Sequence, residues 1–253
     1  MKGAYDIASQ GNGIQQMNHF IKDDGLNALR LPVGWQYLTN GKLGGTLDGN
    51  NFGKFDRLVQ GCLSSGAKLC ILDIHNYARW SGTIIGQGGP TDDQFANIWS
   101  QLATKYKGES KIAFGLMNEP HDVPDIQRWA TSCQAAVNAI RKAGATTQYI
   151  LLPGNDYTSA GKFLTNGSGK ALLNVTDTDN TTSKLIFDVH KYLDSDNSGT
   201  HTNCVTDNIK DAFQPLATWL KENKRMAFVS ETGGGPNDST CLTNLCAQLK
   251  FLK

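Results

Sequence analysis

The sequence lacks the features that would place the chain in a membrane or on a polyanion. It has no run of about 18 apolar residues, the length needed to cross a bilayer. Lys and Arg number 24 against 23 Asp and Glu, a formal net charge of +1, so no broad electrostatic field attracts nucleic acid or anionic lipid. Met1 to Gln10 lacks the basic-then-apolar pattern of a signal peptide. We therefore expect a soluble chain that acts on a neutral substrate.

Signatures of nucleotide, metal and serine chemistry are also missing. Gly11-Asn-Gly13 has no preceding strand, which a dinucleotide-binding fingerprint requires, and Gly233-Gly-Gly235 lacks the Lys-Ser/Thr of a phosphate-binding loop. No GxSxG nucleophile elbow occurs. The six cysteines include no CxxC pair, and their His neighbours lack zinc-ligand spacing. We expect neither a metal ion nor another cofactor.

From residue 14 onward, the sequence alternates short apolar runs with longer segments of helical spacing. Thr91 with Asp92 and Asp93 predicts the start of one such helix. This alternation over about 250 residues predicts one α/β barrel domain, residues 1–253. Six runs predict parallel strands buried on both faces, namely Ala28 to Val33, Leu69 to Ile74, Ile112 to Met117, Tyr149 to Leu152, Leu185 to Val189 and Met226 to Ser230.

Functional side chains lie in or directly after most of these predicted strands. In chain order they are Arg30, His75, Asn76, Asn118, Glu119, His190, Tyr192 and Glu231. In an α/β barrel this end of the strands forms the reaction face. Each residue alone has an ordinary structural explanation, since Asn118-Glu119-Pro120 also fits a helix start and a single His is usually structural. Together, two carboxylates among convergent polar groups indicate acid/base chemistry.

Two segments carry a family resemblance. Leu116-Met-Asn-Glu-Pro-His121 and Phe228-Val-Ser-Glu-Thr-Gly233 resemble the acid/base and nucleophile strands of glycoside hydrolase family five. The resemblance covers essentially the whole chain. Within the family, the chain is most similar to the secreted fungal endo-β-1,4-glucanases, or cellulases. The resemblance continues through Arg30-Leu-Pro-Val-Gly-Trp35, Leu72-Asp-Ile-His-Asn-Tyr-Ala-Arg-Trp80 and Asp188-Val-His-Lys-Tyr-Leu-Asp194.

The resemblance implies a retaining enzyme that hydrolyses internal β-1,4 bonds of cellulose by double displacement. Glu119 would be the general acid/base and Glu231 the nucleophile. Such enzymes hold the two carboxyl groups roughly 5 to 5.5 Å apart. Trp35, Trp80 and Tyr77 are candidates for stacking on glucose rings, although core packing would also explain each of them. The expected substrate-binding residues around the pair are Arg30, His75, Asn76, Asn118, His190 and Tyr192.

By the same resemblance, Cys62 with Cys70 and Cys204 with Cys241 form disulfides, which require an oxidising compartment. Cys133 and Cys246 are expected to be free. Secretion is inferred from the family. Four Asn-x-Ser/Thr sequons favour it weakly, at Asn166, Asn174, Asn180 and Asn237.

Family members continue further at both ends, so we expect a truncated (β/α)8 TIM barrel without its first and last strands. Nothing before Ile14 is typical of a strand, and the chain stops at Lys253. The last strand would normally bring a tryptophan that lies under the sugar. The open edges of the sheet predict a monomer of marginal stability, or association of chains through those edges. Two other functions stay open: a glucan-binding barrel remnant with weak or no turnover, and a retaining glycosidase for another β-glucan or mannan.

Overall fold

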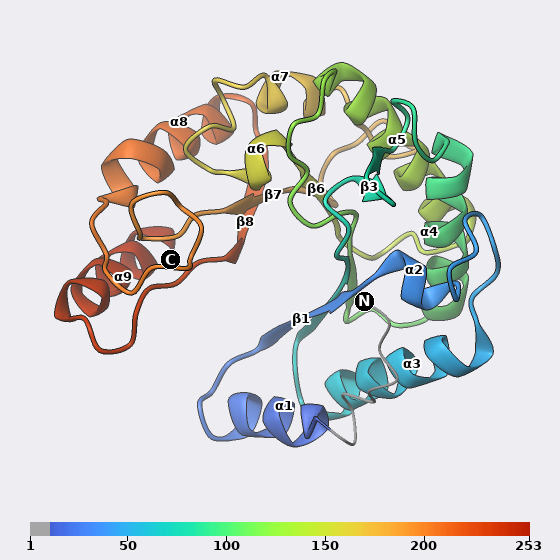
Figure 1. The fold of residues 1–253 in the computed structure, drawn as a ribbon, viewed down its shortest axis with the longest axis horizontal. Coiled ribbons are helices and arrows are strands. Elements are labelled where there is room, and N and C mark those ends of the chain that lie inside the picture. Colours follow the sequence, from blue (N-terminus) through green and yellow to red (C-terminus); the bar gives the residue numbers. More distant parts are fainter. Residues whose placement is uncertain (1–10) are drawn as a thin grey trace.

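The structure is a computed structural model that describes residues 11–253. The expectations for Met1 to Gln10, no signal-peptide pattern and no first strand, lie outside the described residues. Within them, six parallel strands form one sheet (Figure 1). Their ends agree with the predicted strands to within two residues. In sheet order they are β1 (Ala28–Val33), β2 (Leu69–Ile74), β5 (Ile112–Gly115), β6 (Ile150–Pro153), β7 (Leu185–His190) and β8 (Met226–Glu231).

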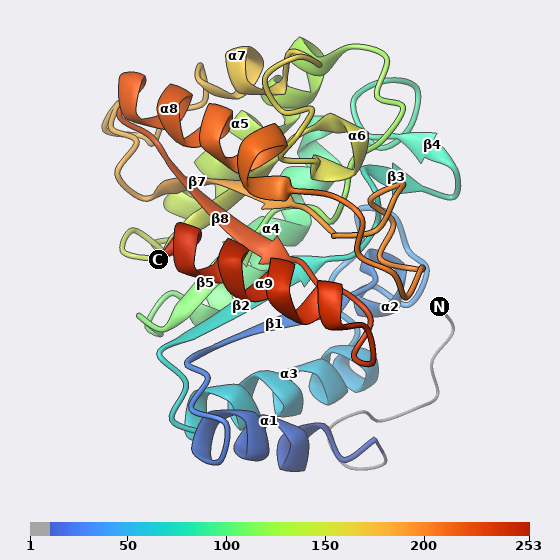
Figure 2. The ribbon, with the colours of Figure 1, turned by 90° about the vertical axis from the view of Figure 1, so that its left-hand side faces the viewer.

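Helices form an arc around these strands, and α1 and α3 lie beneath β1 (Figures 1 and 2). The predicted start at Thr91 is confirmed as a capping box, because its side chain accepts from the Gln94 amide and the Gln94 side chain accepts from the Thr91 amide. The helices are α1 (Gly13–Lys22), α2 (Trp35–Leu38), α3 (Gly49–Ser64), α4 (Asp92–Tyr106), α5 (Ile126–Lys142), α6 (Asn155–Thr158), α7 (Ser168–Leu172), α8 (Gln214–Glu222) and α9 (Ser239–Leu252), with a π-helical turn, Ile209–Phe213, before α8.

The sheet is open, because β1 and β8 occupy its two ends and no pairing joins them among residues 11–253. The described chain is thus part of a (β/α)8 barrel, as expected. The predicted association through these edges, and the prediction of a single domain, stay predictions. A short antiparallel hairpin, β3 (Arg79–Trp80) with β4 (Thr83–Ile84), was not predicted from the sequence.

Apolar side chains of the central strands and of the helix faces form the core. All of β5 and β6 is buried. Trp35 is fully buried as well, and packs against Trp80 and Phe95 with ring centroids 5.1 and 5.9 Å away. The expectation that Trp35 stacks on a sugar is therefore wrong for this structure: its side chain points into the core from the start of α2.

Both expected disulfides are present. Cys62 in α3 bonds to Cys70 in β2, and Cys204, in the loop after β7, bonds to Cys241 in the first turn of α9. Cys133 is free and buried, and Cys246 is free and exposed. The second disulfide joins the segments that follow β7 and β8, the two strands that end at His190 and Glu231.

No helix within residues 11–253 combines the length and the apolar character needed to cross a bilayer.

Candidate active site

Glu119 lies just beyond the end of β5, where the chain changes direction. The Asn118 amide donates to the Ile74 carbonyl at 2.8 Å, which holds this segment beside the end of β2. Glu119 itself has φ 42°, a left-handed backbone that is uncommon for a residue with a side chain. This conformation directs the carboxyl group toward His190, whose Nδ1 lies 2.7 Å from Glu119 Oε1.

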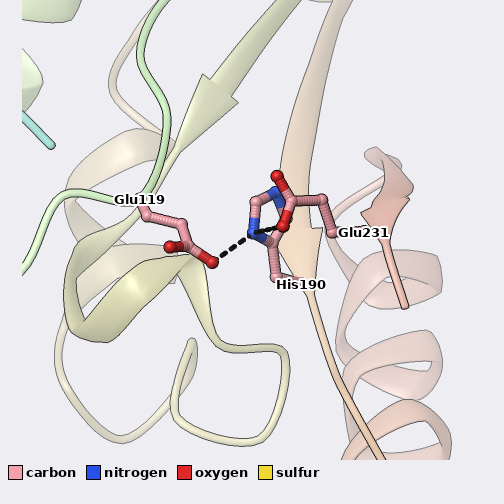
Figure 3. A group of neighbouring side chains, drawn as sticks. All are labelled: Glu119, His190 and Glu231. Atoms are coloured by element: carbon pink, nitrogen blue, oxygen red, sulfur yellow. Dashed lines mark hydrogen bonds and ion pairs between the residues drawn. The ribbon is translucent and has the colours of Figure 1, made fainter. Parts of the chain in front are cut away.

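Glu231 ends β8 and reaches the same histidine from the other side (Figure 3). The register of β7 and β8 shifts between Val189 and His190, so that His190 pairs with Glu231. Glu231 Oε2 lies 3.5 Å from His190 Nδ1. One carboxylate oxygen of Glu119 and one of Glu231 lie within 4.8 Å of each other. The two predicted carboxylates, 112 positions apart in the sequence (231 − 119), do meet.

Glu231 is surrounded by donors. Arg30 Nη1 donates to Oε1 at 2.5 Å, and the Tyr192 hydroxyl donates to Oε2 at 2.8 Å. Burial alone would raise the pKa of Glu231, but the positive charges of His190 and Arg30 and the two hydrogen bonds outweigh it and lower the pKa below its ordinary value. The geometry therefore favours an ionised Glu231.

Arg30 is itself fixed in place by neighbouring strands. Its Nη2 donates to Asn118 Oδ1 at 2.6 Å and pairs with Asp73 Oδ2 at 3.1 Å. Asp73 is almost fully buried and also contacts His75 Nδ1 at 2.8 Å. Because Asn118 accepts from Arg30 through its oxygen, its amide nitrogen points away from the guanidinium and can donate to another group.

His190 is buried between the two glutamates. Burial disfavours its charged form, but the hydrogen bond with Glu119 and the charges of Asp188 and Glu231 outweigh burial and raise the pKa of His190. Its other ring nitrogen, Nε2, lies 2.8 Å from Ser230 Oγ.

Asn76 has a different environment from the one expected of a substrate-binding residue. Its oxygen accepts from the Trp35 amide at 2.7 Å, and its nitrogen donates to Gln36 Oε1 at 2.6 Å and to the Arg79 carbonyl at 3.0 Å. These three contacts use the carboxamide to fix the start of α2 and the loop after β2. Because Asn76 is also part of the lining of a groove, its contact with substrate stays a prediction.

A groove of about 1210 Å³ lies beside the carboxylate pair. It reaches His121, two residues beyond Glu119, and includes Trp80 and Tyr77, two of the predicted stacking candidates. Tyr77 is 36% exposed, whereas Trp80 is only 9% exposed. The lining comes from α2, the first turns of α3, the β3–β4 hairpin and the loops after β1, β2 and β5: Gly34, Gln36, Tyr37, Asn40, Gly41, Asn50, Asn51, Lys54, His75, Asn76, Tyr77, Arg79, Trp80, Ser81, Gly82 and His121.

Tyr157 is a candidate that sequence reasoning missed. It is 49% exposed and stacks on His121 with ring centroids 4.5 Å apart and an interplanar angle of 9°. Three consecutive residues without glycine, 156–158, have φ between 54° and 58°, and the Tyr157 amide donates to the Pro120 carbonyl at 2.9 Å. Such a turn is costly, typically about 1–3 kcal/mol per residue, so the surroundings must enforce it. The available signal was its position just after the fourth predicted strand.

Within residues 11–253, two groups of carboxylate and histidine side chains are compact enough to be considered for a metal ion. In the first group, the Arg30 guanidinium forms an ion pair with Glu231. In the second group, His201 Nδ1 lies 3.2 Å from Asp194 and 3.4 Å from Asp196. These contacts favour chemistry by the side chains themselves. The groups are Glu119, His190 and Glu231, and Asp194, Asp196 and His201.

Comparison with known proteins places this geometry in a family. The family profile described as Cellulase (glycosyl hydrolase family 5) matches residues 4–253. Endoglucanase EG-II of Hypocrea jecorina is 61% identical over 241 residues, which are 95% of this chain and 57% of that protein. The Manganese dependent endoglucanase Eg5A of Phanerodontia chrysosporium is 52% identical over 99% of this chain and 65% of its own length. The chain thus spans little more than half the length of the first of these relatives.

Solved structures agree. The crystal structure of Cel5A (EG2) from Hypocrea jecorina (Trichoderma reesei) superposes with a TM-score of 0.94 at 58% identity, over 98% of this chain and 76% of that one. XacCel5A in complex with cellopentaose superposes with a TM-score of 0.86 at 32% identity, over 94% and 75%. From the profile, the relatives and the carboxylate pair together, the chain belongs to the cellulase family, glycosyl hydrolase family 5.

Proposed function

We propose that this chain is a retaining endo-β-1,4-glucanase that cuts internal bonds of cellulose-like glucans. The observation that carries the proposal is the approach of Glu119 and Glu231, with carboxylate oxygens within 4.8 Å on either side of His190. Retaining glycosidases hold their carboxyl groups about 5 to 5.5 Å apart, whereas inverting enzymes need about 6.5 to 9.5 Å to admit a water molecule. The names of the relatives support the substrate class.

In the first step, Glu231 attacks the anomeric carbon while Glu119 protonates the leaving oxygen. Arg30 and Tyr192 keep Glu231 ionised and aim its two oxygens. In the second step the ester-linked Glu231 no longer carries a negative charge, and Glu119, now a carboxylate, takes a proton from the incoming water. Asn118 is placed to donate its amide to the sugar 2-hydroxyl, a contact that strengthens in the transition state.

The groove and the aromatic side chains beside it are proposed to bind the glucan. Tyr77, His121 and Tyr157 form a line of rings next to Glu119, with consecutive centroids 5.9 and 4.5 Å apart. His75 continues this line beyond Tyr77, at 5.5 Å. Rings of this kind stack on the apolar faces of sugars, and the polar groups of the lining can hydrogen-bond sugar hydroxyls. A relative in the family binds cellopentaose in its solved structure.

A substrate panel tests the proposal. On carboxymethyl cellulose we expect release of reducing ends together with a rapid fall in viscosity, because internal cuts shorten chains faster than terminal ones. Higher rates on mannan or another β-glucan would identify a sister specificity. Retention on insoluble cellulose without release of sugar would instead favour a glucan-binding protein. We propose no nucleic-acid or membrane partner, and a monomeric state.

Replacing Tyr192 by Phe is expected to raise the pKa of Glu231, because the variant loses a donor to the charged carboxylate. The nucleophile must be ionised to attack, so the acidic limb of kcat/KM should move to higher pH by about one unit, with a loss of about 10- to 100-fold below that limb. Initial rates measured from about pH 3 to about pH 8 give both the shift of the limb and the loss of activity. Tyr149→Phe, at the amino end of β6, is the matched control. An unmoved acidic limb would contradict the role of Tyr192.

We propose that the protein is extracellular, since both disulfides need an oxidising compartment. A secreted preparation from yeast is then expected to carry N-glycans on exposed acceptors and none on Asn166. The Asn166 amide nitrogen donates to the Asn155 carbonyl and to Asp156, beside the turn that presents Tyr157. Peptide mapping by mass spectrometry, with Asn174→Gln as control, tests this; a glycan on Asn166 would refute it. The exposed acceptors are Asn174, Asn180 and Asn237.

A further inference from the structure

Helix α9 turns a glutamine inward and leaves leucines exposed. Along its residues 239–252, all of which the structure describes, the buried side chains are Cys241 and Gln248. Gln248 is 1% exposed, whereas Leu242 and Leu249 of the same helix are 68% and 53% exposed. This order reverses the usual preference for apolar burial, and burying a carboxamide is costly unless it is hydrogen-bonded. The partners of Gln248 therefore decide what its burial achieves.

Gln248 joins the segments that follow β7 and β8. Asn208 Nδ2 donates to Gln248 Oε1 at 2.9 Å and to the Tyr192 carbonyl at 3.0 Å. Gln248 Nε2 donates to Thr232 Oγ1 at 2.7 Å, and that hydroxyl donates to the Lys191 carbonyl at 2.6 Å. Asn208 is 2% exposed, so both carboxamides are shielded from water. We call the side chains of Asn208, Gln248 and Thr232 the amide bridge.

The two backbone carbonyls at its ends fix the direction of every hydrogen bond in the amide bridge. A carbonyl oxygen can only accept, so the Asn208 nitrogen faces Tyr192, and the same nitrogen requires the oxygen of Gln248. The nitrogen of Gln248 then faces Thr232, whose single proton goes to Lys191. Flipping either carboxamide would set donor against donor or acceptor against acceptor. The amide bridge therefore has one arrangement.

The ends of the amide bridge lie on either side of the contact that aims the nucleophile. Lys191 directly precedes Tyr192, and Thr232 directly follows Glu231. The Lys191 amide also donates to the Glu231 carbonyl at 3.1 Å. Resting on the proposed function, we infer that Gln248, through the amide bridge, holds the Tyr192 hydroxyl 2.8 Å from Glu231 Oε2. Gln248 is a positioning residue, because it acts through the backbone of the two segments.

The state of Glu231 reports on this contact. Burial raises the pKa of Glu231, but the charges of His190 and Arg30 and the hydrogen bonds from Tyr192 and Arg30 outweigh it and lower the pKa. Uncharged substitutions in the amide bridge leave the charges in place, so a rise in the pKa measures the loss of the Tyr192 donor. The charged groups that act on Tyr192 or Glu231 are Arg30 in β1, Glu119 after β5, His190 in β7 and Lys191 after β7, with Asp194 and Asp211 acting on Lys191.

Thr232→Val tests the amide bridge with little change in shape, since it removes the hydroxyl that joins Gln248 to Lys191. We expect the pKa of Glu231 to rise by about half a unit to one unit, and Thr232→Ser, which keeps the hydroxyl, to restore it. Carbon-13 NMR of the glutamate carboxyl groups in the intact protein measures this titration without any need for activity, and Glu231→Gln identifies the signal. Thr243→Val, the same change on the exposed face of α9, is the matched control. An unchanged titration in Thr232→Val would overturn the inference.

A double-substitution cycle separates positioning from a general loss of stability. Because Glu231 must be ionised to attack, Gln248→Leu is expected to move the acidic limb of kcat/KM to higher pH by about half a unit to one unit. In a Tyr192→Phe background the hydroxyl is already absent, so Gln248→Leu should move the limb no further.

Two outcomes of the cycle would overturn the inference. A structural defect alone would lower the rates at every pH and leave the limb in place. Equal shifts in both backgrounds would mean that Gln248 acts on Glu231 by a route other than Tyr192. If wild type hydrolyses no glucan, the proposed function fails, while the carboxyl titration still decides the role of the amide bridge.

Discussion

Replacing Glu231 by Gln is expected to reduce hydrolysis of carboxymethyl cellulose by about 10⁴-fold or more, since removing a covalent nucleophile costs the whole double-displacement route. Gln has nearly the same shape, so the fold should survive. Its amide cannot attack the anomeric carbon and no longer attracts the Arg30 guanidinium, which now lies 2.5 Å from Oε1. Single-turnover and steady-state rates, measured with a reducing-sugar assay, give the size of the loss.

The matched control is Glu222→Gln, the same chemical change on the exposed end of α8. It should leave both the melting temperature and the hydrolysis rate close to those of wild type. A thermal melt of Glu231→Gln separates lost chemistry from lost structure. If this variant stays folded and hydrolyses glucan at a near-normal rate, Glu231 is not the nucleophile.

Replacing Glu119 by Ala is expected to reduce hydrolysis of cellulose by about 10²- to 10⁴-fold, the usual contribution of a general acid and base. The loss should be much smaller in the first step of an activated aryl glycoside, whose leaving group departs without a proton. Azide should then restore turnover, because a small anion can enter the space left by the carboxyl group and attack the glycosyl-enzyme without base assistance. The measurable product is a glycosyl azide.

The configuration of that azide distinguishes the two glutamates. Rescue of Glu119→Ala must give the β-azide, because the anion attacks an intermediate still bonded to Glu231. In Glu231→Ala, azide would take the place of the nucleophile and give the α-azide. An α product from Glu119→Ala would mean that the roles of the two residues are exchanged.

Much of this site was predictable because it depends on local patterns repeated at the ends of strands. Buried strands are short apolar runs, and the polar residue that follows each run must reach the same edge of a parallel sheet. Glu119, His190 and Glu231 were found in this way. Their mutual approach depends on strand order and on the curvature of the sheet, because β6 lies between β5 and β7.

The remainder depends on geometry that no local pattern encodes. Trp35 follows a strand as a binding residue would, but the first turn of α2 rotates its ring into the core. Asn76 makes three contacts within the protein, with partners as far as 41 positions away, and these contacts set the orientation of its side chain. Tyr157 depends on a left-handed turn at 156–158, where only Asp156 is of a residue type that adopts this conformation readily. In each case the orientation of one side chain, rather than the identity of the residue, decides its role.

The Cys204–Cys241 bond joins the loop beyond Tyr192 to the helix beyond Glu231, and a methyl group on Gly234 would collide with the Cys204 sulfur. The tyrosine that aims the nucleophile and the nucleophile itself therefore share a covalent clamp. Reducing this bond with a thiol such as dithiothreitol would release that link. Anyone who purifies this protein should leave the reductant out.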